Sequence, residues 1–194
     1  MTAHRFSTSI FGALSGAFRV LCPVAILITG LHIGPVEPAR AQSQFDPYPD
    51  ITGPTQVIEG DRLIVNGTPV RLYGIDAPEM GQICFARGNR PYDCGMAARN
   101  MLDMIIDGRE VECAVYSDLH TGTRSASCWI GGISVGLDVG AAMVYRGFAF
   151  SERGHSNRYE RHEASAQSRR AGVWSGRAQR PWAWRQEQAE RGLR

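Results

Sequence analysis

The chain has 194 residues, 43% of them hydrophobic and 21% charged, and its 21 basic residues are all arginine. That length suits one domain with a substantial core, and the sequence contains no internal repeat, low-complexity block or sign of a second domain. Without residues 1–41 the chain has 18 arginines and 18 acidic residues. This zero formal net charge argues against avid nonspecific binding to long DNA, which depends on strongly basic surfaces.

Residues 1–41 are typical of a secretory signal peptide. Residues 20–33 form a mainly apolar run, and Ala39-Arg40-Ala41 provides an A-x-A cleavage site before Gln42. The alternative is a membrane anchor, which needs about 20 apolar residues to span a bilayer. A proline, a glycine and a histidine interrupt this run. We therefore expect cleavage, which predicts a secreted or periplasmic protein without stable membrane association.

A β-hairpin is predicted soon after this cleavage site. Residues 42–54 contain three prolines and are expected to form an extended leader into the domain. Two apolar runs follow, residues 63–65 and 70–75, and they flank Asn66-Gly67. Because this pair readily takes the positive φ angles of a tight turn, the pattern indicates two antiparallel strands.

Acidic residues gather at the ends of this predicted hairpin. Glu59 and Asp61 precede its first strand, and Asp76 and Glu79 follow its second, so closing the hairpin brings them together. Carboxylate oxygens suit a hard cation such as Ca²⁺, and the guanidinium of Arg71 could grip a phosphate with two hydrogen bonds. Short acidic runs at strand ends are also common in ordinary solvated turns, and the residue pattern alone leaves both interpretations open.

The first pair of cysteines after the signal peptide brackets a loop. Cys84 and Cys94 enclose a segment rich in Gly, Arg and Pro, and in a secreted chain a disulfide is the default interpretation. A metal site is the alternative, but it would need nearby histidines that this loop lacks.

The second pair of cysteines lies on two predicted strands. Residues 111–116 and 125–130 read as strands on either side of a polar loop, with Cys113 and Cys128 almost symmetrical about it. In an antiparallel pair these cysteines would face one another, a geometry that a disulfide can bridge. Four cysteines allow three pairings, and the pairs 84–94 and 113–128 keep both closures local.

Three helices are predicted. In residues 94–107 the apolar positions recur at helical spacing and Gly108 follows as a stop, while residues 137–146 precede Gly147 in the same way. Residues 159–170 read as the third helix. Its arginines favour a solvated face. The tryptophans that follow, Trp174, Trp182 and Trp184, are interpreted as packing residues rather than ligand contacts.

Residues 57–79 as a whole resemble the thermonuclease family, typified by staphylococcal nuclease. That family's pattern is D-G-D-T, a hairpin, then R-L-x-G-I-D-A-P-E, and here the order, the spacing and the turn agree. The resemblance extends to about residue 185. It implies an α+β fold, a five-stranded OB-type Greek-key barrel with three helices. We place the domain at residues 55–185, with a tail at 186–194, and expect a monomer.

The resemblance also implies a calcium site and catalytic residues. Carried over by position, Asp61 and Asp76 are the Ca²⁺ ligands, with the backbone carbonyl of Ala77 as a third. Arg71 is implied to grip the phosphate, and Glu79 to be the general base that activates water.

The family's second catalytic arginine is displaced by one residue in this sequence. The family motif is Y-G-R-x-x-A, and counting back from Ala126 puts Thr123 at the arginine position, with Arg124 one residue late. In a regular strand that slip would point Arg124 away from the site. A bulge at Gly122 would return it. We favour the bulge and include Arg124 among the catalytic residues.

Two functions follow from these residues. The first is a Ca²⁺-dependent endonuclease that hydrolyses phosphodiester bonds of DNA or RNA and leaves a 3′-phosphate and a 5′-hydroxyl, as the resemblance implies. The second is a nuclease-fold binding or accessory protein with weak or no catalysis, for example in envelope polysaccharide metabolism. The displaced arginine and the neutral charge favour the second function, whereas the presence of Asp61, Arg71, Asp76 and Glu79 favours the first.

Overall fold

The computed structural model describes residues 48–119, 122–152, 154 and 156–192. The predicted signal peptide, with its cleavage site, lies outside these described residues, as does the start of the predicted leader. Within them, none of the helices has the length and apolar character needed to cross a membrane.

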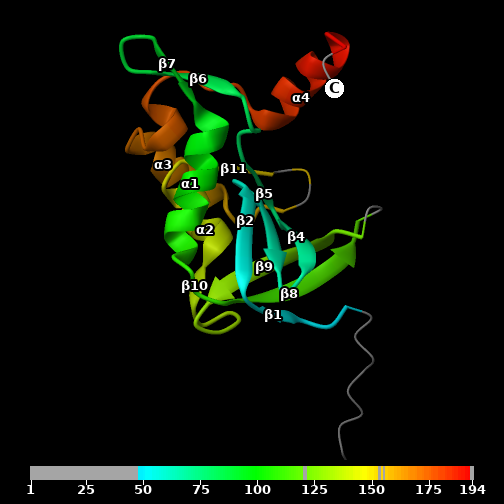
Figure 1. Cartoon of the computed structure of the whole chain (residues 1–194). Coiled ribbons are helices and arrows are strands. Elements are labelled where there is room, and N and C mark those ends of the chain that lie inside the picture. The colour runs from blue at the N-terminus through cyan, green and yellow to red at the C-terminus, as the bar shows by residue number, and fades with distance from the viewer. Residues whose placement is uncertain (1–47, 120–121, 153, 155, 193–194) are drawn as a thin grey trace, which may run out of the picture. The chain divides into compact units, whose positions relative to one another are not determined.

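In the described residues, seven short strands precede the first helix, and the remaining strands and helices are interspersed after it (Figure 1). The strands are β1 (Ile51–Gly53), β2 (Thr55–Glu59), β3 (Arg62–Val65), β4 (Thr68–Leu72), β5 (Ile75–Asp76), β6 (Ile83–Ala86), β7 (Arg90–Asp93), β8 (Val111–Asp118), β9 (Arg124–Ile130), β10 (Leu137–Asp138) and β11 (Phe150–Ser151). The helices are α1 (Cys94–Ile106), α2 (Val139–Tyr145), α3 (Glu160–Ser168), the 3₁₀ helix η1 (Gly172–Ser175) and α4 (Pro181–Glu190).

The main sheet has the strand order expected of an OB-type Greek key. Its order is β1-β8-β9-β4-β3-β2, with β10 beside β9. Strands β2, β3 and β4 form an antiparallel meander, whereas β9 returns parallel to β4. Figure 1 shows α1, α2 and α3 gathered on one side of the sheet and α4 apart from them. The predicted fold class is confirmed.

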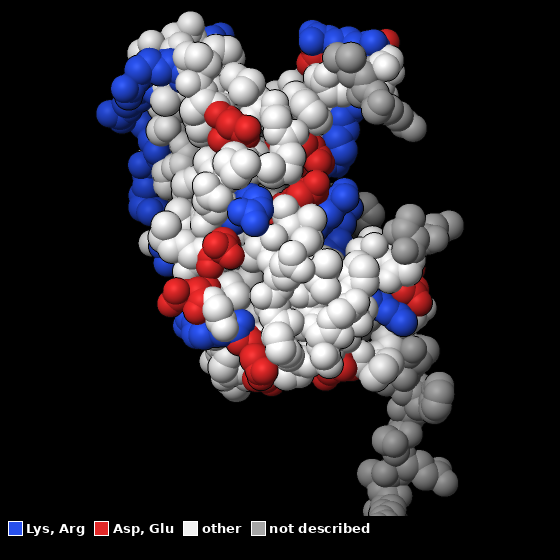
Figure 2. Space-filling view, in the orientation of Figure 1, with Lys and Arg blue, Asp and Glu red and all other residues white. Residues whose placement is uncertain are grey.

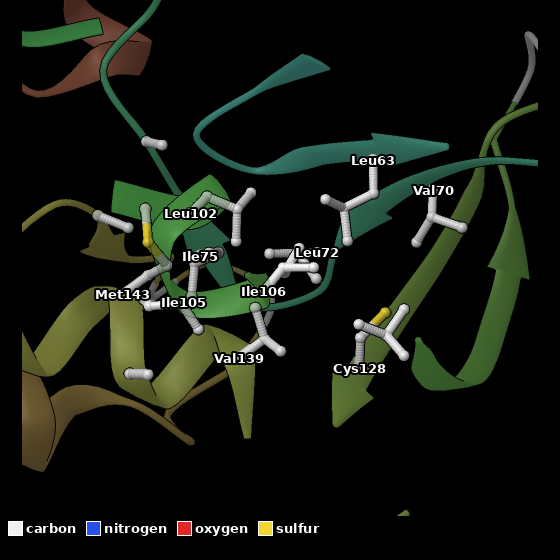
Figure 3. Packing of buried hydrophobic residues seen from close by; sticks show 14 of the residues in the cluster. Leu63, Val70, Leu72, Ile75, Leu102, Ile105, Ile106, Cys128, Val139 and Met143 are labelled. Carbon is white, nitrogen blue, oxygen red and sulfur yellow. The ribbon is translucent and has the colours of Figure 1, made fainter. Parts of the chain in front are cut away.

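The predicted hairpin is the β3–β4 pair. Asn66 and Gly67 have φ angles of 47° and 78°, as a tight turn requires. Because side chains alternate across a strand, Leu63, Val70 and Leu72 point into the core. Figure 3 shows Leu63 and Leu72 on the side of Leu102, Ile105 and Ile106 of α1, with Val70 farther out towards Cys128, and these α1 residues bury one stripe of that helix. The opposite face of β4 is left to carry Arg71.

Both predicted disulfides are present. Cys84 is bonded to Cys94, with their Cα atoms 5.6 Å apart. Cys113 and Cys128 are directly opposite in the β8–β9 ladder and are bonded, with their Cα atoms 4.0 Å apart. The first bond ties the β6–β7 hairpin to the start of α1, and the second ties together two neighbouring strands of the main sheet.

The structure differs from the sequence expectation in three respects. The five long strands are joined by two short ones, and in the described residues the strand path stays open rather than closing into a barrel. Strand β1, within the predicted leader, pairs with β8, so the sheet begins before residue 55. A fourth α-helix, α4, begins at Pro181, since proline favours the first turn of a helix, and it continues into the predicted tail.

Candidate active site

Two buried aspartates meet beside Arg71. Asp61 lies in the turn between β2 and β3, and Asp76 ends β5, just after the strand that carries Arg71. Arg71 Nε is 3.5 Å from Asp61 Oδ2, and Arg71 Nη2 donates a hydrogen bond to Asp76 Oδ1 at 3.3 Å. The hairpin therefore brings together three of the predicted site residues.

Asp61 is a buried carboxylate with few partners. It is 6% exposed, and its 3.5 Å contact with Arg71 Nε is an ion pair too long to count as a hydrogen bond. Burial raises the pKa of Asp61 from 3.8 to about 6, opposed by Arg71 and reinforced by the charge of Asp76. A buried, poorly compensated carboxylate of this kind would be stabilised by a bound cation.

Glu79 joins the cluster from the loop after β5. A buried glutamine, Gln82, accepts a hydrogen bond from the backbone N–H of Glu79 at 3.1 Å and donates to the carbonyl of Gln179 at 2.8 Å. This loop also lies against α1, because a side chain at Gly95 would collide with the carbonyl of Glu79. The position of Glu79 is therefore fixed from two directions.

The cluster contains a second arginine that the sequence reasoning missed. Arg185, on α4, donates from Nη1 to Asp76 Oδ1 at 2.9 Å and from Nη2 to Asp76 Oδ2 at 3.2 Å, and its Nη1 also contacts Glu79. Partial burial lowers the pKa of Arg185, but the bonds to Asp76 and Glu79 outweigh this effect and raise it above its ordinary value. Arg185 is therefore a permanent cation at the carboxylates.

Asp76 also caps α4. The N–H of Trp182 donates to Asp76 Oδ2 at 3.1 Å, whereas Arg180, the N-cap residue, makes no side-chain cap of its own. The signal for this element was present in the sequence. Pro181 followed by Trp-Ala-Trp-Arg marks a helix start, but no local pattern indicates that the helix docks on a carboxylate 106 residues earlier.

An open cleft adjoins the cluster. Its volume is about 430 Å³, and Asp76, Phe150, Glu152, Arg180 and Trp182 line it. Trp182 is 57% exposed there, so the expectation that it is a packing residue does not hold. Figure 2 shows acidic and basic atoms side by side at the hollow below α4.

A smaller hollow of about 110 Å³ lies beside Arg71. Its lining includes Tyr73, Ser125 and Glu152, so Glu152 borders both spaces. Glu152 Oε1 is 3.9 Å from Arg71 Nη2. A ligand could thus reach Asp76 from the cleft and Arg71 from the smaller hollow.

Arg124 is not brought to this cluster. It forms an ion pair with Asp118 at 2.8 Å and lies 5.9 Å from the ring centre of Tyr48. The strand irregularity lies in β8, between Val115 and Ser117, rather than at Gly122. Ser125 is therefore the residue paired with Arg71 across the parallel strands, and Arg124 points elsewhere.

The donor set fits a hard cation only in part. Asp61 and Asp76 offer buried carboxylate oxygens, and Ala77 beside them is also buried. In the described residues, no three His, Cys, Asp or Glu side chains converge closely enough to hold a metal. Because Ca²⁺ takes six to eight oxygen ligands, most would have to come from backbone carbonyls, water or substrate.

Comparison with known proteins identifies a family. The family model described as staphylococcal nuclease homologue matches residues 69–176. The succinoglycan biosynthesis protein ExoI of Rhizobium meliloti (strain 1021) is 29% identical over 127 residues, which are 64% of this chain and 64% of that protein. The probable staphylococcal-like nuclease CAN1 of Oryza sativa subsp. japonica is 29% identical over 131 residues, 66% of this chain and 35% of that protein.

A third relative is covered more fully. Protein ParB of Escherichia coli is 30% identical over 150 residues, which are 70% of this chain and 79% of that protein. The chain spans less than two thirds of the length of ExoI and about a third of the length of CAN1.

Proposed function

The chain belongs to the staphylococcal nuclease homologue family, and on that premise we propose that it is a secreted, Ca²⁺-dependent endonuclease acting on DNA or RNA. The observation that carries the proposal is one charged cluster, in which Arg71 contacts Asp61 and Asp76 while Arg185 joins Asp76 to Glu79. Asp76 opens this cluster to the cleft. A phosphodiester hydrolase needs a base, a positioned water and positive charge at the phosphoryl oxygens, and this cluster holds side chains of each required kind.

In the proposed reaction, Glu79 accepts a proton from water, and the oxygen of that water attacks phosphorus. The bond from phosphorus to the 5′ oxygen breaks, and the leaving oxygen takes up a proton to give a 5′-hydroxyl, while the other product retains a 3′-phosphate. Arg71 donates to the phosphoryl oxygens as their negative charge grows. Asp61, Asp76 and the carbonyl of Ala77 would hold Ca²⁺, which would polarise the phosphate when bound.

The test is digestion of single-stranded DNA and of RNA, with Ca²⁺ or with EGTA. We expect cleavage only with Ca²⁺, products that end in a 3′-phosphate, and a loss of activity in Glu79→Gln, which keeps the shape of the side chain without its basicity. Calorimetry should show that Asp61→Ala and Asp76→Ala abolish Ca²⁺ binding. Unchanged Ca²⁺ affinity in both variants would mean that the metal site has been assigned to the wrong residues.

A second candidate function is an accessory role without efficient catalysis. The similarity to ExoI, whose name places it in succinoglycan biosynthesis, favours it, as does the pairing of Arg124 with Asp118. An inert wild-type protein that still binds Ca²⁺ would support this candidate over the nuclease.

A further inference from the structure

Arg185 is the feature of the cluster that remains without a function. Its guanidinium contacts Asp76 and Glu79, two of the residues to which the proposed reaction assigns roles. In the sequence, however, Arg185 lies more than 100 residues after them. We infer that Arg185 binds the phosphodiester group of the substrate beside Arg71. This inference rests on the proposed function, because it names a further residue that contacts the same substrate.

The charges of the cluster require a second cation. Asp61, Asp76, Glu79 and Glu152 all lie within 4 Å of Arg71 or Arg185. A phosphodiester carries a negative charge, so four carboxylates balanced by Arg71 alone would repel it, and a Ca²⁺ bound by Asp61 and Asp76 would offset only part of their charge. Arg185 offsets part of that charge, and it does so at every working pH because a guanidinium stays protonated.

The guanidinium also has unused donors. Its bonds to Asp76 and Glu79 occupy both Nη1 hydrogens and one of the two on Nη2, which leaves one Nη2 hydrogen and the Nε–H without acceptors in the described chain. The side chain is 38% exposed and contacts Asp76, which lines the cleft, so a ligand that reaches Asp76 comes close to this guanidinium. A fork of this kind binds phosphate oxygens as readily as carboxylates.

Helix α4 holds this arginine in place before any ligand arrives. Arg180, just ahead of the helix, forms a 3.2 Å ion pair with the buried Glu163 and stacks over Phe150 at 5.0 Å. Gln82 fixes the preceding backbone at Gln179. Because these contacts anchor the first turn, the entropy lost on binding is reduced, as expected of a preorganised binding residue.

Trp182 supports the same assignment from one turn earlier. Residues 182 and 185 are separated by three positions and so share a helix face. On that face Trp182 lines the cleft with its ring largely exposed. A cation for the backbone beside an aromatic surface for a base is the usual combination for binding single-stranded nucleic acid.

The alternative is that Arg185 is an internal plug, meaning that its guanidinium occupies the position that Ca²⁺ would take on Asp76. A plug would compete with Ca²⁺, so its removal would tighten Ca²⁺ binding and increase turnover. A phosphate-binding residue gives the opposite result, since its removal weakens substrate binding and slows turnover. The two roles therefore differ in the sign of the effect.

The experiment measures binding separately from cleavage. A fluorescein-labelled single-stranded DNA with phosphorothioate linkages, which resist hydrolysis, is titrated with protein in Ca²⁺ and in EGTA, and its anisotropy is followed. The proteins are wild type, Arg185→Ala, Arg185→Gln, Arg185→Lys and Arg191→Ala. The last is the matched control, because it removes an equal charge at the C-terminal end of α4, where among the described residues the side chain pairs only with Glu187.

We expect Arg185→Ala and Arg185→Gln to weaken binding in Ca²⁺ at least tenfold, Arg185→Lys to recover part of it, and Arg191→Ala to stay within about twofold of wild type. Turnover should fall by about 10²-fold or more in Arg185→Ala, as when other preorganised donors are removed. Thermal melting and amide exchange at Trp182 check that α4 remains docked, and Arg185→Gln serves if the alanine variant does not fold.

Wild-type binding of the probe by Arg185→Ala, or tighter Ca²⁺ binding with faster turnover, would overturn the inference. A wild-type protein that does not bind the probe would overturn it as well. If wild type binds the probe through Arg185 but cleaves no substrate, the inference holds and the proposed nuclease function fails.

Discussion

Asp61→Asn should stabilise the protein in the absence of Ca²⁺, although the substitution removes a residue of the candidate site. Burial raises the pKa of the Asp61 carboxyl to about 6, so the native state binds a proton more tightly than the unfolded state does. The stabilisation that this proton provides is fully present below pH 3.8 and is lost as the pH rises through 6. At neutral pH the ionised carboxylate therefore destabilises the metal-free fold.

The size of the effect follows from the shift. The pKa rises by about 2 units and each unit corresponds to 1.36 kcal/mol, so ionised Asp61 costs up to about 3 kcal/mol at pH 7.5. Asparagine has nearly the same shape and carries no charge. The stability of Asp61→Asn relative to wild type should therefore increase by up to about 3 kcal/mol between pH 4 and pH 7.5.

Urea denaturation followed by circular dichroism, in EGTA at both pH values, measures this difference. The control is Asp103→Asn, which removes an exposed carboxylate from α1. With Ca²⁺ at pH 7.5 the order should reverse, because only wild type gains binding energy from the metal. A difference between Asp61→Asn and wild type that does not change with pH would refute the reasoning, because it would mean that Asp61 is not a strained carboxylate.

Three further predictions follow. Arg124→Ala should change turnover by less than about twofold, because Arg124 pairs with Asp118 rather than with a carboxylate of the cluster and such an exposed pair adds little to the stability of the fold. A large loss of turnover in the digestion assay would indicate that Arg124 acts at the site. Trp182→Ala should weaken oligonucleotide binding by about 1–3 kcal/mol if a base stacks on it, and an unchanged anisotropy titration would contradict this. Intact mass of exported protein should show a start near Gln42 and four hydrogens lost to disulfides; a full-length reduced chain would count against export.

Local patterns in the sequence were enough to predict the hairpin and its carboxylates. The Asn66-Gly67 turn fixes the β3–β4 register, and the register places Arg71 on the face opposite Leu72 and brings it beside Asp61. The two disulfides followed for the same reason, since each joins cysteines that a short loop or a strand pair already brings together. In both cases the residues that interact are separated by few positions in the sequence.

The role of α4 could not be predicted in this way. Its helix start is visible in the sequence at Pro181, but the bond from Arg185 to Asp76 spans 109 residues and depends on the packing of the segments between them. Amphipathic periodicity gives no help, because Pro181 is the one buried residue of α4 and the contacts of Trp182 N–H and Arg185 with Asp76 are polar. A helix held by hydrogen bonds and charge leaves little hydrophobic signal.

The two arginines illustrate why a motif and a site can diverge. Arg124 lies one residue from the position that the family pattern assigns to an arginine, yet strand alternation turns it towards Asp118. Arg185 matches no active-site position of that pattern, yet its guanidinium lies on Asp76 and Glu79. A phosphoryl transition state responds to where positive charge lies in space, and the order in which the chain supplies that charge has no effect on it. The loss of an arginine from a strand can therefore be compensated by an arginine on any rigid element that reaches the same carboxylates. In this chain we infer that α4 supplies it.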